Sequence, residues 1–597
     1  MILTVFLTRC RIIEKQIKFL KAMNKTKNIM VTVFVLAIST TTLAQSVGER
    51  FLHNGIFYKI TSLTPATVEV STERNTPPYW FDYYEPRGNV VIPSTVTHNN
   101  MAFKVTAVGN NSFYDCDRLI SVTIPGSVKS IGFRSFTKCD SLTSVTFPDS
   151  IMLIGDYAFS YCSRITSFTI PELVTSIGIN TFFKCTGLTS VTFPDSLTSI
   201  GKNAFGYCTN LTSVTIPNFL ATIGDFAFGY CTNLTTVNLP DNVTSIGWWA
   251  FSHCANLTSI NLPETVTSIG RGAFSYCESL TSIIIPTSAT SIGNGAFEGC
   301  IGLTSLIIPK SVTSIGYGVF RRCSSLTAID VEAENTEYSS ENGVLFNYDK
   351  TMLIAYPAGR EGESYTISSY VTSLGIAAFE GSVNLTSIII PESITSISRD
   401  AFSKCTLLDS INIPDSVTSI GDAAFGSCSS LISITIPATV KSIGYMAFAH
   451  CVGLTSITSH IADPRSVTLG DEVFFGVPKG TDANACALYV PEAGLHLYQN
   501  VWQWKDFLPN MFTGIEDIPQ ISVIVYPNPT SDFLNIKSNT PICSFELYDV
   551  LGKLVQNNTE MFNPECVIDV SSLTCGIYFI RLHTTNGIAE HKVMIDF

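Results

Sequence analysis

Residues 208–230 read CTNLTSVTIPNFLATIGDFAFGY, and Cys231 begins the same pattern again. Ten such 23-residue units are continuous, and four more follow after a break, the first of them with Ser382 in the cysteine position. The column cysteines are Cys116, Cys139, Cys162, Cys185, Cys208, Cys231, Cys254, Cys277, Cys300 and Cys323, and then Cys405, Cys428 and Cys451. Self-similarity at a fixed period between about 20 and 50 residues predicts a solenoid.

The unit can be interpreted physically. Val214 and Ile216 alternate with polar residues, which predicts a short strand with one buried face. Pro217 ends that strand because proline has no N–H to donate to a sheet. Gly224 marks a turn, and the apolar residues around it indicate a tight turn or short helix, namely Leu220, Ile223, Ala227 and Phe228. Stacked units would bury a continuous core and form a parallel sheet, so the expected fold class is mainly β with short helical turns.

Composition narrows the possible partners. The chain has 597 residues, of which 14% are charged, and its formal net charge is −13. Residues 1–44 carry seven basic residues and one acidic residue, so the remainder has 28 basic and 47 acidic residues and a net charge of −19. This acidic balance argues against a nucleic-acid partner, and the low charged fraction argues against a disordered polyelectrolyte. No uninterrupted apolar run reaches about 18 residues, so no transmembrane span is expected in the mature chain.

The cysteine column admits two interpretations. Stacked coils would place equivalent Cα atoms about 5 Å apart, which is within the range for a disulfide. However, stacked side chains point in parallel, which holds their Cβ atoms too far apart for relaxed S–S geometry. We therefore predict buried free thiols that pack as small apolar groups. The sequence contains no Cys-x-x-Cys and no histidine at metal-ligand spacing, so we expect no metal.

The first 44 residues have the features of an export signal. Basic residues precede the apolar run Ile29–Ile38, and Thr42-Leu43-Ala44 forms a small-residue cleavage site before Gln45. Met23 is a natural start for such a peptide, so residues 1–22 are interpreted as an upstream, mis-assigned start.

Changes in periodicity divide the rest of the chain. Exposed ends of a solenoid need caps against edge pairing, and Val344-Leu345-Phe346 followed by turn residues predicts a hairpin between the two repeat blocks. Short alternating strands near the C-terminus predict a β-sandwich. The expected order is an N-terminal β-cap at 45–90, first repeats at 91–330, a hairpin insertion at 331–360, second repeats at 361–458, a C-terminal cap at 459–512, a linker at 513–520 and an Ig-like β-sandwich at 521–597.

Two sets of motifs resemble known families. The pattern Cys-x-x-Leu-x-Ser-Ile/Val-x-Ile-Pro resembles the 23-residue BspA-like (Treponema pallidum) leucine-rich repeat. Tyr526-Pro527-Asn528-Pro529, the segment from Glu546 to Lys553 and the segment from Leu573 to Phe579 resemble the type IX secretion sorting domain of Bacteroidetes. This resemblance implies that the type IX machinery recognises residues 521–597. It also implies a secreted protein, or one held at the outer-membrane surface of a Bacteroidetes-type bacterium, often after cleavage and attachment to lipopolysaccharide.

The sequence carries no convincing catalytic motif. Serine and threonine abound, but none stands in Gly-x-Ser-x-Gly, and the chain has only 8 histidines to serve as bases. No calcium-loop pattern is present. We therefore expect no catalytic residue, no cofactor and no enzymatic activity.

Two departures from the polar repeat consensus suggest binding surfaces. Aromatic residues gather before the cysteines and after the glycines of neighbouring coils, at Tyr207, Phe226, Tyr230, Trp248, Trp249 and Tyr276. They would contact a protein or a sugar, or they pack among themselves. On the outward strand face, isoleucine replaces the usual threonine or asparagine at Ile284, Ile307 and Ile389. These isoleucines form an apolar docking patch or lie under the hairpin insertion, and the hairpin is the favoured interpretation.

The leading functional hypothesis follows from the resemblance. Similar BspA-like proteins bind host matrix proteins or other cells, which implies an adhesin with a protein or glycan ligand at the cell surface. The alternatives are a glycan-binding surface module and a structural envelope component. An enzyme would need a catalytic cluster assembled from distant repeats, which the scarcity of histidine disfavours.

Overall fold

The protein is mostly β in the computed structural model, which confirms the expected fold class. The structure describes residues 45–80, 85–480, 485–513, 523–549, 553–558, 563–584 and 587–596. The expected signal peptide at 1–44 lies outside these residues, as does most of the expected linker at 513–520. The chain divides into two units, Met1–Gly362 with Gly375–Asn384, and Glu363–Leu374 with Leu385–Phe597, which are described in turn.

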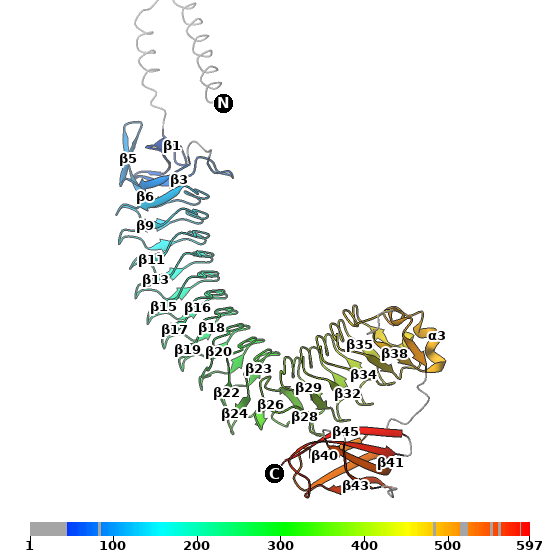
Figure 1. Ribbon diagram of the computed structural model, residues 1–597. Helices are drawn as coiled ribbons and strands as arrows, with labels where there is room; N and C mark the ends of the chain where they lie inside the picture. Colours follow the sequence, from blue (N-terminus) through cyan, green and yellow to red (C-terminus); the bar gives the residue numbers. More distant parts are fainter. Residues whose placement is uncertain are drawn as a thin grey trace, which may run out of the picture. The chain divides into compact units, whose positions relative to one another are not determined.

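A small β-cap begins the first unit (Figure 1). Strand β2 (Ile56–Leu63) pairs antiparallel with β1 (Arg50–His53) and with β3 (Ala66–Ser71). Strand β6 (Met101–Val108) pairs antiparallel with β5 (Thr95–His98) and parallel with β3, and it continues in parallel to the first repeat strand. The parallel pairing of β3 with β6 therefore covers the edge at which the stack of coils starts.

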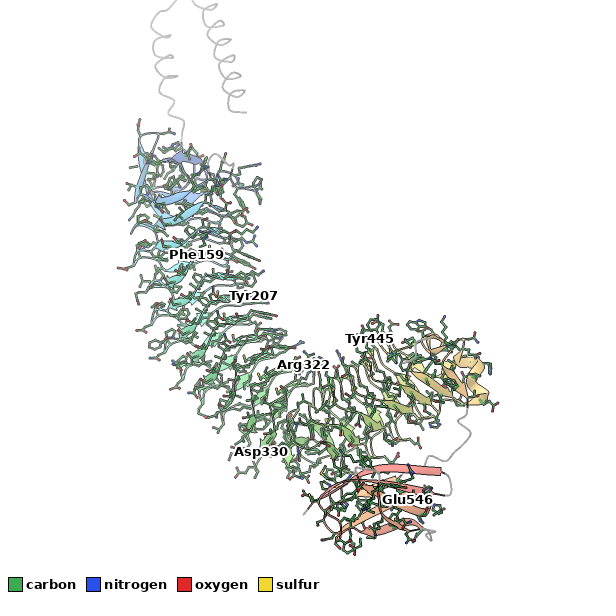
Figure 2. The ribbon with its side chains drawn as sticks, viewed as in Figure 1. Phe159, Tyr207, Arg322, Asp330, Tyr445 and Glu546 are labelled. Atoms are coloured by element: carbon green, nitrogen blue, oxygen red, sulfur yellow. The ribbon has the colours of Figure 1, made fainter. Side chains whose placement is uncertain are left out.

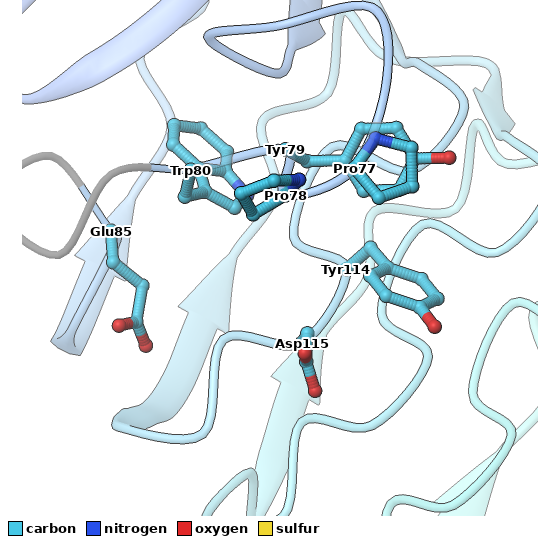
Figure 3. A pocket seen from close by; sticks show the side chains of 7 residues that line it. All are labelled: Pro77, Pro78, Tyr79, Trp80, Glu85, Tyr114 and Asp115. Atoms are coloured by element: carbon cyan, nitrogen blue, oxygen red, sulfur yellow. The ribbon is translucent and has the colours of Figure 1, made fainter.

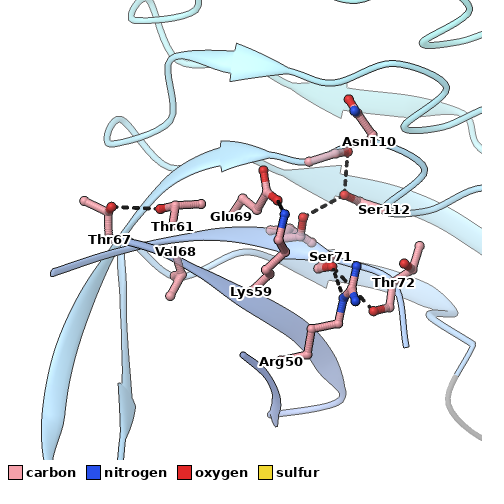
Figure 4. Close-up of polar contacts among 12 residues, drawn as sticks. Arg50, Lys59, Thr61, Thr67, Val68, Glu69, Ser71, Thr72, Asn110 and Ser112 are labelled. Atoms are coloured by element: carbon pink, nitrogen blue, oxygen red, sulfur yellow. Dashed lines mark hydrogen bonds and ion pairs between the residues drawn. The ribbon is translucent and has the colours of Figure 1, made fainter. Parts of the chain in front are cut away.

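Polar contacts fix the cap on the first coil (Figure 4). Lys59 Nζ lies 3.0 Å from Glu69 Oε1 across β2 and β3. Arg50 Nε donates to Ser71 Oγ at 2.8 Å, and Ser112 Oγ donates to the carbonyl oxygen of Val70 at 2.8 Å. Ser112 belongs to the first coil, so this last bond joins the coil to the cap.

The coils of the first block contribute short parallel strands in two series, although the coil that holds Ile284 has no strand in the first series. The first series comprises β4 (Gly88–Val91), β7 (Leu119–Thr123), β9 (Ser144–Thr146), β11 (Ser167–Thr169), β13 (Ser190–Thr192), β15 (Ser213–Thr215), β17 (Thr236–Asn238), β19 (Ser259–Asn261), β22 (Ser305–Ile308) and β24 (Ala328–Val331). The register is one repeat, so that Val214 lies opposite Val191 and Val237. Equivalent residues of successive coils therefore form straight columns.

The second series runs along another side of the coils. It comprises β8 (Ser130–Ile131), β10 (Leu153–Ile154), β12 (Ser176–Ile177), β14 (Ser199–Ile200), β16 (Thr222–Ile223), β18 (Ser245–Ile246), β20 (Ser268–Ile269), β21 (Ser291–Ile292) and β23 (Ser314–Ile315). These strands also pair in parallel with a one-repeat register, as Ile223 does with Ile200 and Ile246.

A column of phenylalanine rings fills the interior. Phe228 is fully buried, and its ring centroid lies 5.4 Å from that of Phe205 and 5.5 Å from that of Phe251, with the planes within 6° of parallel. The column consists of Phe113, Phe136, Phe159, Phe182, Phe205, Phe228, Phe251, Phe274, Phe297 and Phe320. Figure 2 shows Phe159 within the body of its coil. The repeat therefore stacks one ring on the next through the whole block.

The column cysteines are buried thiols, as predicted. Each Sγ in the first block from Cys139 onward donates to the carbonyl oxygen of the column phenylalanine 26 residues earlier, for example from Cys231 to Phe205 at 3.2 Å. Burial raises the pKa of the Cys231 thiol to about 12. The thiol thus acts as a small apolar group with one donor that satisfies a buried carbonyl.

The second half of each coil consists of turns rather than the short helix that the sequence also allowed. Two non-glycine residues four positions apart adopt left-handed backbone angles, as Phe226 (φ 55°) and Tyr230 (φ 61°) do. Between the strand and these turns lies the column glycine. A Cβ at Gly224 would stand 2.7 Å from the carbonyl carbon of Gly201 and 2.8 Å from the nitrogen of Lys202. Glycine is needed there because backbones of adjacent coils meet at that point.

We expect Gly224→Ala to lower the free energy of unfolding by about 1–3 kcal/mol, because the added methyl group overlaps backbone that cannot move independently. Gly126→Ala is the matched control, since a Cβ at Gly126 would have no heavy atom within 4 Å. Urea unfolding of both variants would check this. Equal stability of the two variants would contradict the close approach at Gly224.

The insertion completes a coil of the stack. Strand β25 (Tyr338–Glu341) pairs antiparallel with β26 (Val344–Asn347), which pairs with β27 (Met352–Ala355). Leu345 is buried in the core of the first block. Tyr356 stacks on Phe379 at 5.1 Å, and its N–H donates to the carbonyl oxygen of Ala378, as a column phenylalanine donates in a regular coil. Tyr356 therefore takes the place of the column phenylalanine.

The second unit continues the repeats with the same pairing. One series comprises β28 (Ser364–Thr366), β30 (Ser387–Ile389), β32 (Ser410–Asn412), β34 (Ser433–Ile436), β36 (Ser456–Ser459), β38 (Ala487–Val490) and β39 (Met511–Thr513). The other comprises β29 (Ser373–Leu374), β31 (Ser396–Ile397), β33 (Ser419–Ile420), β35 (Ser442–Ile443) and β37 (Thr468–Leu469). Both series are parallel where neighbouring strands pair.

Aromatic side chains close the ring column at the end of the repeats. Trp504 and Phe507 pack against Phe474 at centroid distances of 5.0 and 5.3 Å. Phe507 ends η3 (Lys505–Phe507), and Trp504 is the N-cap residue of that helix. The other short helices are η1 (Pro464–Ser466), η2 (Glu492–Gly494) and α3 (Leu495–Tyr498). These four are the helices found among the described residues. Trp504 and Phe507 therefore end the stack of phenylalanine rings at Phe474.

The C-terminal region is an antiparallel, barrel-like domain. Its strands are β40 (Val523–Tyr526), β41 (Phe533–Asp549), β42 (Leu554–Asn558), β43 (Asn563–Asp569), β44 (Gly576–Thr584) and β45 (Gly587–Ile595). The long strand β41 pairs with β40 and β43 along its first half and with β42 and β44 along its second half. The layers expected of a sandwich are therefore joined through β41, around a core that includes Leu534, Leu547 and Ile580.

Candidate interaction surfaces

One edge of the first block carries a ladder of stacked rings. Tyr207 lies parallel to Tyr230 with centroids 4.3 Å apart, Tyr230 to His253 at 4.1 Å, and His253 to Tyr276 at 4.6 Å. Each residue precedes a column cysteine, so the 23-residue register brings them together. We call Tyr207, Tyr230, His253 and Tyr276 the aromatic ladder. The sequence reasoning found its tyrosines but missed His253, which occupies the same column.

The ladder extends in both directions. The Lys184 ammonium group lies 5.5 Å from the Tyr207 ring centroid. At the other end, the Tyr276 hydroxyl contacts both Glu298 and Arg322. Arg322 Nε also donates at 3.1 Å to Glu380, whose side chain is fully buried. The ladder therefore ends in an ion-pair network at the coil that follows the insertion.

Burial favours the neutral forms of His253, Tyr207 and Tyr276 in the ladder. Burial lowers the pKa of His253, although the carboxylates of Glu278 and Glu298 oppose this shift. Burial likewise raises the pKa of the Tyr207 and Tyr276 phenols. Because the ring faces cover one another, only ring edges and hydroxyl groups are presented to a partner. These contacts support the interpretation that the ladder packs within itself.

A second aromatic cluster lies after the column glycines. The Phe226 and Trp249 rings are 5.0 Å apart at an interplanar angle of 28°, and the Arg271 guanidinium lies 5.0 Å from the Trp249 centroid. Trp248 stands edge-on to Trp249 at 6.3 Å and remains 55% exposed. Of this cluster, Trp248 is the residue whose ring is available to a partner.

We expect Trp249→Ala to lower the free energy of unfolding by about 1–2 kcal/mol, because it removes an aromatic stack and a cation–π contact. Trp248→Ala, the neighbouring exposed residue, should change it by less than about 0.5 kcal/mol. Urea unfolding of the two variants measures the difference. A Trp248→Ala variant as destabilised as Trp249→Ala would show that the exposed ring also has a packing role.

The isoleucines of the outward strand face are uncovered. Ile284 is 75% exposed and Ile307 is 58% exposed, in adjacent coils of the first unit. The prediction that the hairpin lies over this face is therefore wrong for both residues, because the insertion continues the stack instead. Ile307 lies opposite Asp330 in register, and Figure 2 shows Asp330 and Tyr207 at opposite edges of the coils. The isoleucine pair and the aromatic ladder are thus separate surfaces.

Ile389 belongs to the second unit and is described by itself. It is 50% exposed at the end of β30, and it lies opposite Thr366 and Asn412 in the parallel register. Its neighbours in the column are therefore polar, so it stands as a single apolar residue on that face.

The described residues contain no group of three or more histidine, cysteine, aspartate or glutamate side chains arranged to hold a metal ion. No helix among them has the length and apolar character needed to cross a bilayer.

The stacked parallel coils define a leucine-rich repeat protein. A family model described as BspA type leucine rich repeat region matches residues 106–231, 199–327 and 358–477, which together span more than half of the sequence. The chain belongs to this family of BspA-type leucine-rich repeat proteins. A second model, of the secretion system C-terminal sorting domain, matches residues 524–596. The protein is therefore a surface leucine-rich repeat protein with a type IX sorting tail, from a family of repeat proteins rather than enzymes.

Several solved structures are similar to this chain. A leucine-rich repeat protein from Bacteroides ovatus is 28% identical, covers 78% of this chain and 99% of its own, and has a TM-score of 0.43. A leucine rich cell surface protein from Faecalibacterium prausnitzii is 26% identical, with coverages of 70% and 96% and a TM-score of 0.36. The pneumococcal vaccine antigen PcpA is 21% identical, with coverages of 79% and 98% and a TM-score of 0.37. No curated protein matches the chain.

Proposed function

We propose that this protein is an adhesin that binds a protein partner at the outer surface of a Bacteroidetes-type bacterium. The observation that supports this most is the adjacent pair Ile284 and Ile307, which are 75% and 58% exposed in a column that polar residues otherwise occupy within the first unit. Water-exposed isoleucines in neighbouring coils stabilise the fold little, so their value lies in what they contact. The sorting tail supports delivery of the repeats to the cell surface.

The chemistry of the pair favours a protein over a glycan. Isoleucine offers only aliphatic surface and cannot form hydrogen bonds with sugar hydroxyls, whereas buried apolar anchors contribute much of the affinity between proteins. The ladder tyrosines would be the natural platform for sugar rings, but their faces are covered by one another. Trp248 is the residue that favours the alternative of glycan binding, because its indole ring is 55% exposed.

A binding assay with the mature chain tests the proposal. The chain is applied to a panel of immobilised host matrix proteins and to a glycan array, alongside the double variant Ile284→Thr and Ile307→Thr. Threonine is the usual residue of this column, so the backbone should be unaffected. The matched control is Thr192→Asn, because asparagine also occurs in the column at Asn238 and Asn261.

We expect the parent chain to bind one or more matrix proteins and the isoleucine double variant to bind them at least tenfold more weakly. The melting temperature of the double variant and the affinity of the control variant should equal those of the parent chain. Equal binding by the double variant would reject this surface. Binding confined to the glycan array and lost in Trp248→Ala would support the glycan alternative. An absence of any ligand, together with altered envelope integrity in a deletion strain, would support a structural role.

A further inference from the structure

A pocket lies between the N-terminal cap and the first coil. It has a volume of about 380 Å³ and is lined by Pro77, Pro78, Tyr79, Trp80, Glu85, Tyr114 and Asp115. Figure 3 shows the prolines, Tyr79 and Trp80 along one side, and the Tyr114 ring with the carboxylates of Glu85 and Asp115 along the other. The pocket is separate from the isoleucine pair and from the aromatic ladder, and the repeat pattern does not account for it.

Aromatic side chains form much of the wall. Tyr79 and Tyr114 pack edge to face with centroids 5.3 Å apart. The Trp80 side chain is only 8% exposed, so its indole ring is packed within the cap. Lys138 places its ammonium group 5.8 Å from the centroid of Tyr114. This contact already pairs one pocket-wall ring with an alkylammonium group.

The charge around the pocket is negative. Glu85 and Asp115 line it, and Asp117 and Asp140 lie close enough to act on their neighbours. Burial and the adjacent Asp117 carboxylate raise the pKa of Glu85, although Arg118 opposes this. The Asp140 pKa is raised by burial and by the carboxylates of Asp115 and Asp117.

No lysine or arginine is among the described residues that line the pocket. The nearby Arg118 is largely exposed, with its Nε 3.8 Å from Asp117 Oδ1, and the Lys138 ammonium group lies over the ring of Tyr114. One carboxylate oxygen of Glu85 is buried without a hydrogen-bond partner. Glu85 and Asp115 line the pocket, the Asp117 carboxylate acts on Glu85, and none of the seven lining residues carries a positive charge, so the field in the pocket favours a cation.

We propose that this pocket binds an alkylammonium group. Aromatic faces attract a cation through their quadrupole, and the carboxylates add a direct electrostatic attraction. The proline and tryptophan surfaces contact the methylene groups of such a ligand, which a hydrated inorganic cation lacks. A divalent metal is disfavoured because the described residues contain no cluster of three metal-ligating groups. The ligand is either a free amine or a lysine side chain of a polypeptide.

Calorimetric titration of the mature chain with n-butylammonium chloride tests the proposal. The uncharged analogue 1-pentanol has a similar length, and sodium chloride at equal ionic strength serves as the blank. We expect butylammonium to bind at least tenfold more tightly than 1-pentanol, with an affinity that falls as salt is added. Two further titrations, with 1,4-diaminobutane and with a lysine-containing peptide, distinguish a free amine from a polypeptide as the better source.

Variants locate the binding to the pocket. The double variant Glu85→Gln and Asp115→Asn should weaken butylammonium binding at least tenfold, and Tyr114→Leu should weaken it at least threefold while keeping apolar bulk. The matched control is Asp195→Asn with Asp241→Asn, which removes two exposed carboxylates outside the pocket. Thermal unfolding confirms that each variant is folded.

The outcomes separate the proposal from its alternatives. Equal binding of butylammonium and 1-pentanol, or no heat with either, would overturn it. If the control variant weakens butylammonium binding as much as the pocket variant does, the effect comes from the overall charge of the protein. That result would also overturn the proposal. If Tyr114→Leu lowers the melting temperature, the test rests on the double variant of Glu85 and Asp115, because that variant removes only charge.

Discussion

Raising the pH from 7 to 10 is expected to lower the stability of the repeats more than any single substitution would. The cause is the buried column of thiols. Burial raises the pKa of Cys231 and Cys323 to about 12 in the folded chain, whereas a thiol in an unfolded chain ionises near pH 8.5.

The sign follows from proton binding. Below about pH 8.5 both states hold the proton, so the thiols contribute their full stability. Between about pH 8.5 and 12 the unfolded state loses the proton and the folded state keeps it, so the free energy of unfolding falls as the pH rises. The loss at pH 10 is about 2 kcal/mol for each such thiol, and ten coils of the first block repeat the same group.

Urea unfolding at pH 7, 8.5 and 10 measures this dependence. Replacing Cys208, Cys231 and Cys254 together by serine should make the stability fall less steeply with pH. Serine fits the column, since the Ser382 hydroxyl donates at 2.8 Å to the carbonyl oxygen of Phe379. A free energy of unfolding that is constant from pH 7 to 10 would mean that the thiols are accessible to ionisation in the folded chain.

Phe228→Ala is expected to cost about 3–5 kcal/mol. Phe228 is fully buried and stacks on rings on both sides, at 5.4 and 5.5 Å. Its loss would leave a cavity in the middle of a column whose other members are fixed by the coil backbone, so the gap has little means to close. Each neighbouring coil would also lose one of its two ring contacts.

Phe219→Ala is the matched control, because Phe219 belongs to the same coil and is 65% exposed. Its stability should stay within about 0.5 kcal/mol of the parent protein. Urea or thermal unfolding of both variants gives the comparison. If the two substitutions lowered the stability by similar amounts, the buried column of rings would not be a main source of the stability of the core.

The repeat columns could be predicted because every coil has the same neighbours. A residue type that recurs every 23 positions meets itself in the next coil, so burial of Cys231 and Phe228 followed from spacing alone. The same logic fails where the period breaks. Tyr356 stands 23 residues before Phe379 but 36 residues after Phe320, so the longer segment between Phe320 and Tyr356 hid this member of the column and the sequence indicated only a hairpin. For the same reason the sequence wrongly favoured a hairpin lying over Ile284 and Ile307, which are exposed.

Two features had no usable signal in the sequence. The residues before the cysteines are as different as Lys184, Tyr207 and Arg322, yet all adopt left-handed backbone angles. The turn imposes this conformation, and residue identity does not reveal it. The pocket likewise brings Trp80 and Glu85 of the cap next to Tyr114 of the first coil. No motif and no regular spacing in the sequence relates these residues.

The one-repeat register of the parallel strands has an evolutionary consequence. Because Val214 meets Val191 on one side and Val237 on the other, a coil that is duplicated or lost leaves a seam identical to those already present. Unequal recombination within the gene therefore yields arrays that remain foldable, each coil changing the length of the stack by about 4.8 Å. Selection can adjust the reach of the repeats in small steps without having to find a new fold.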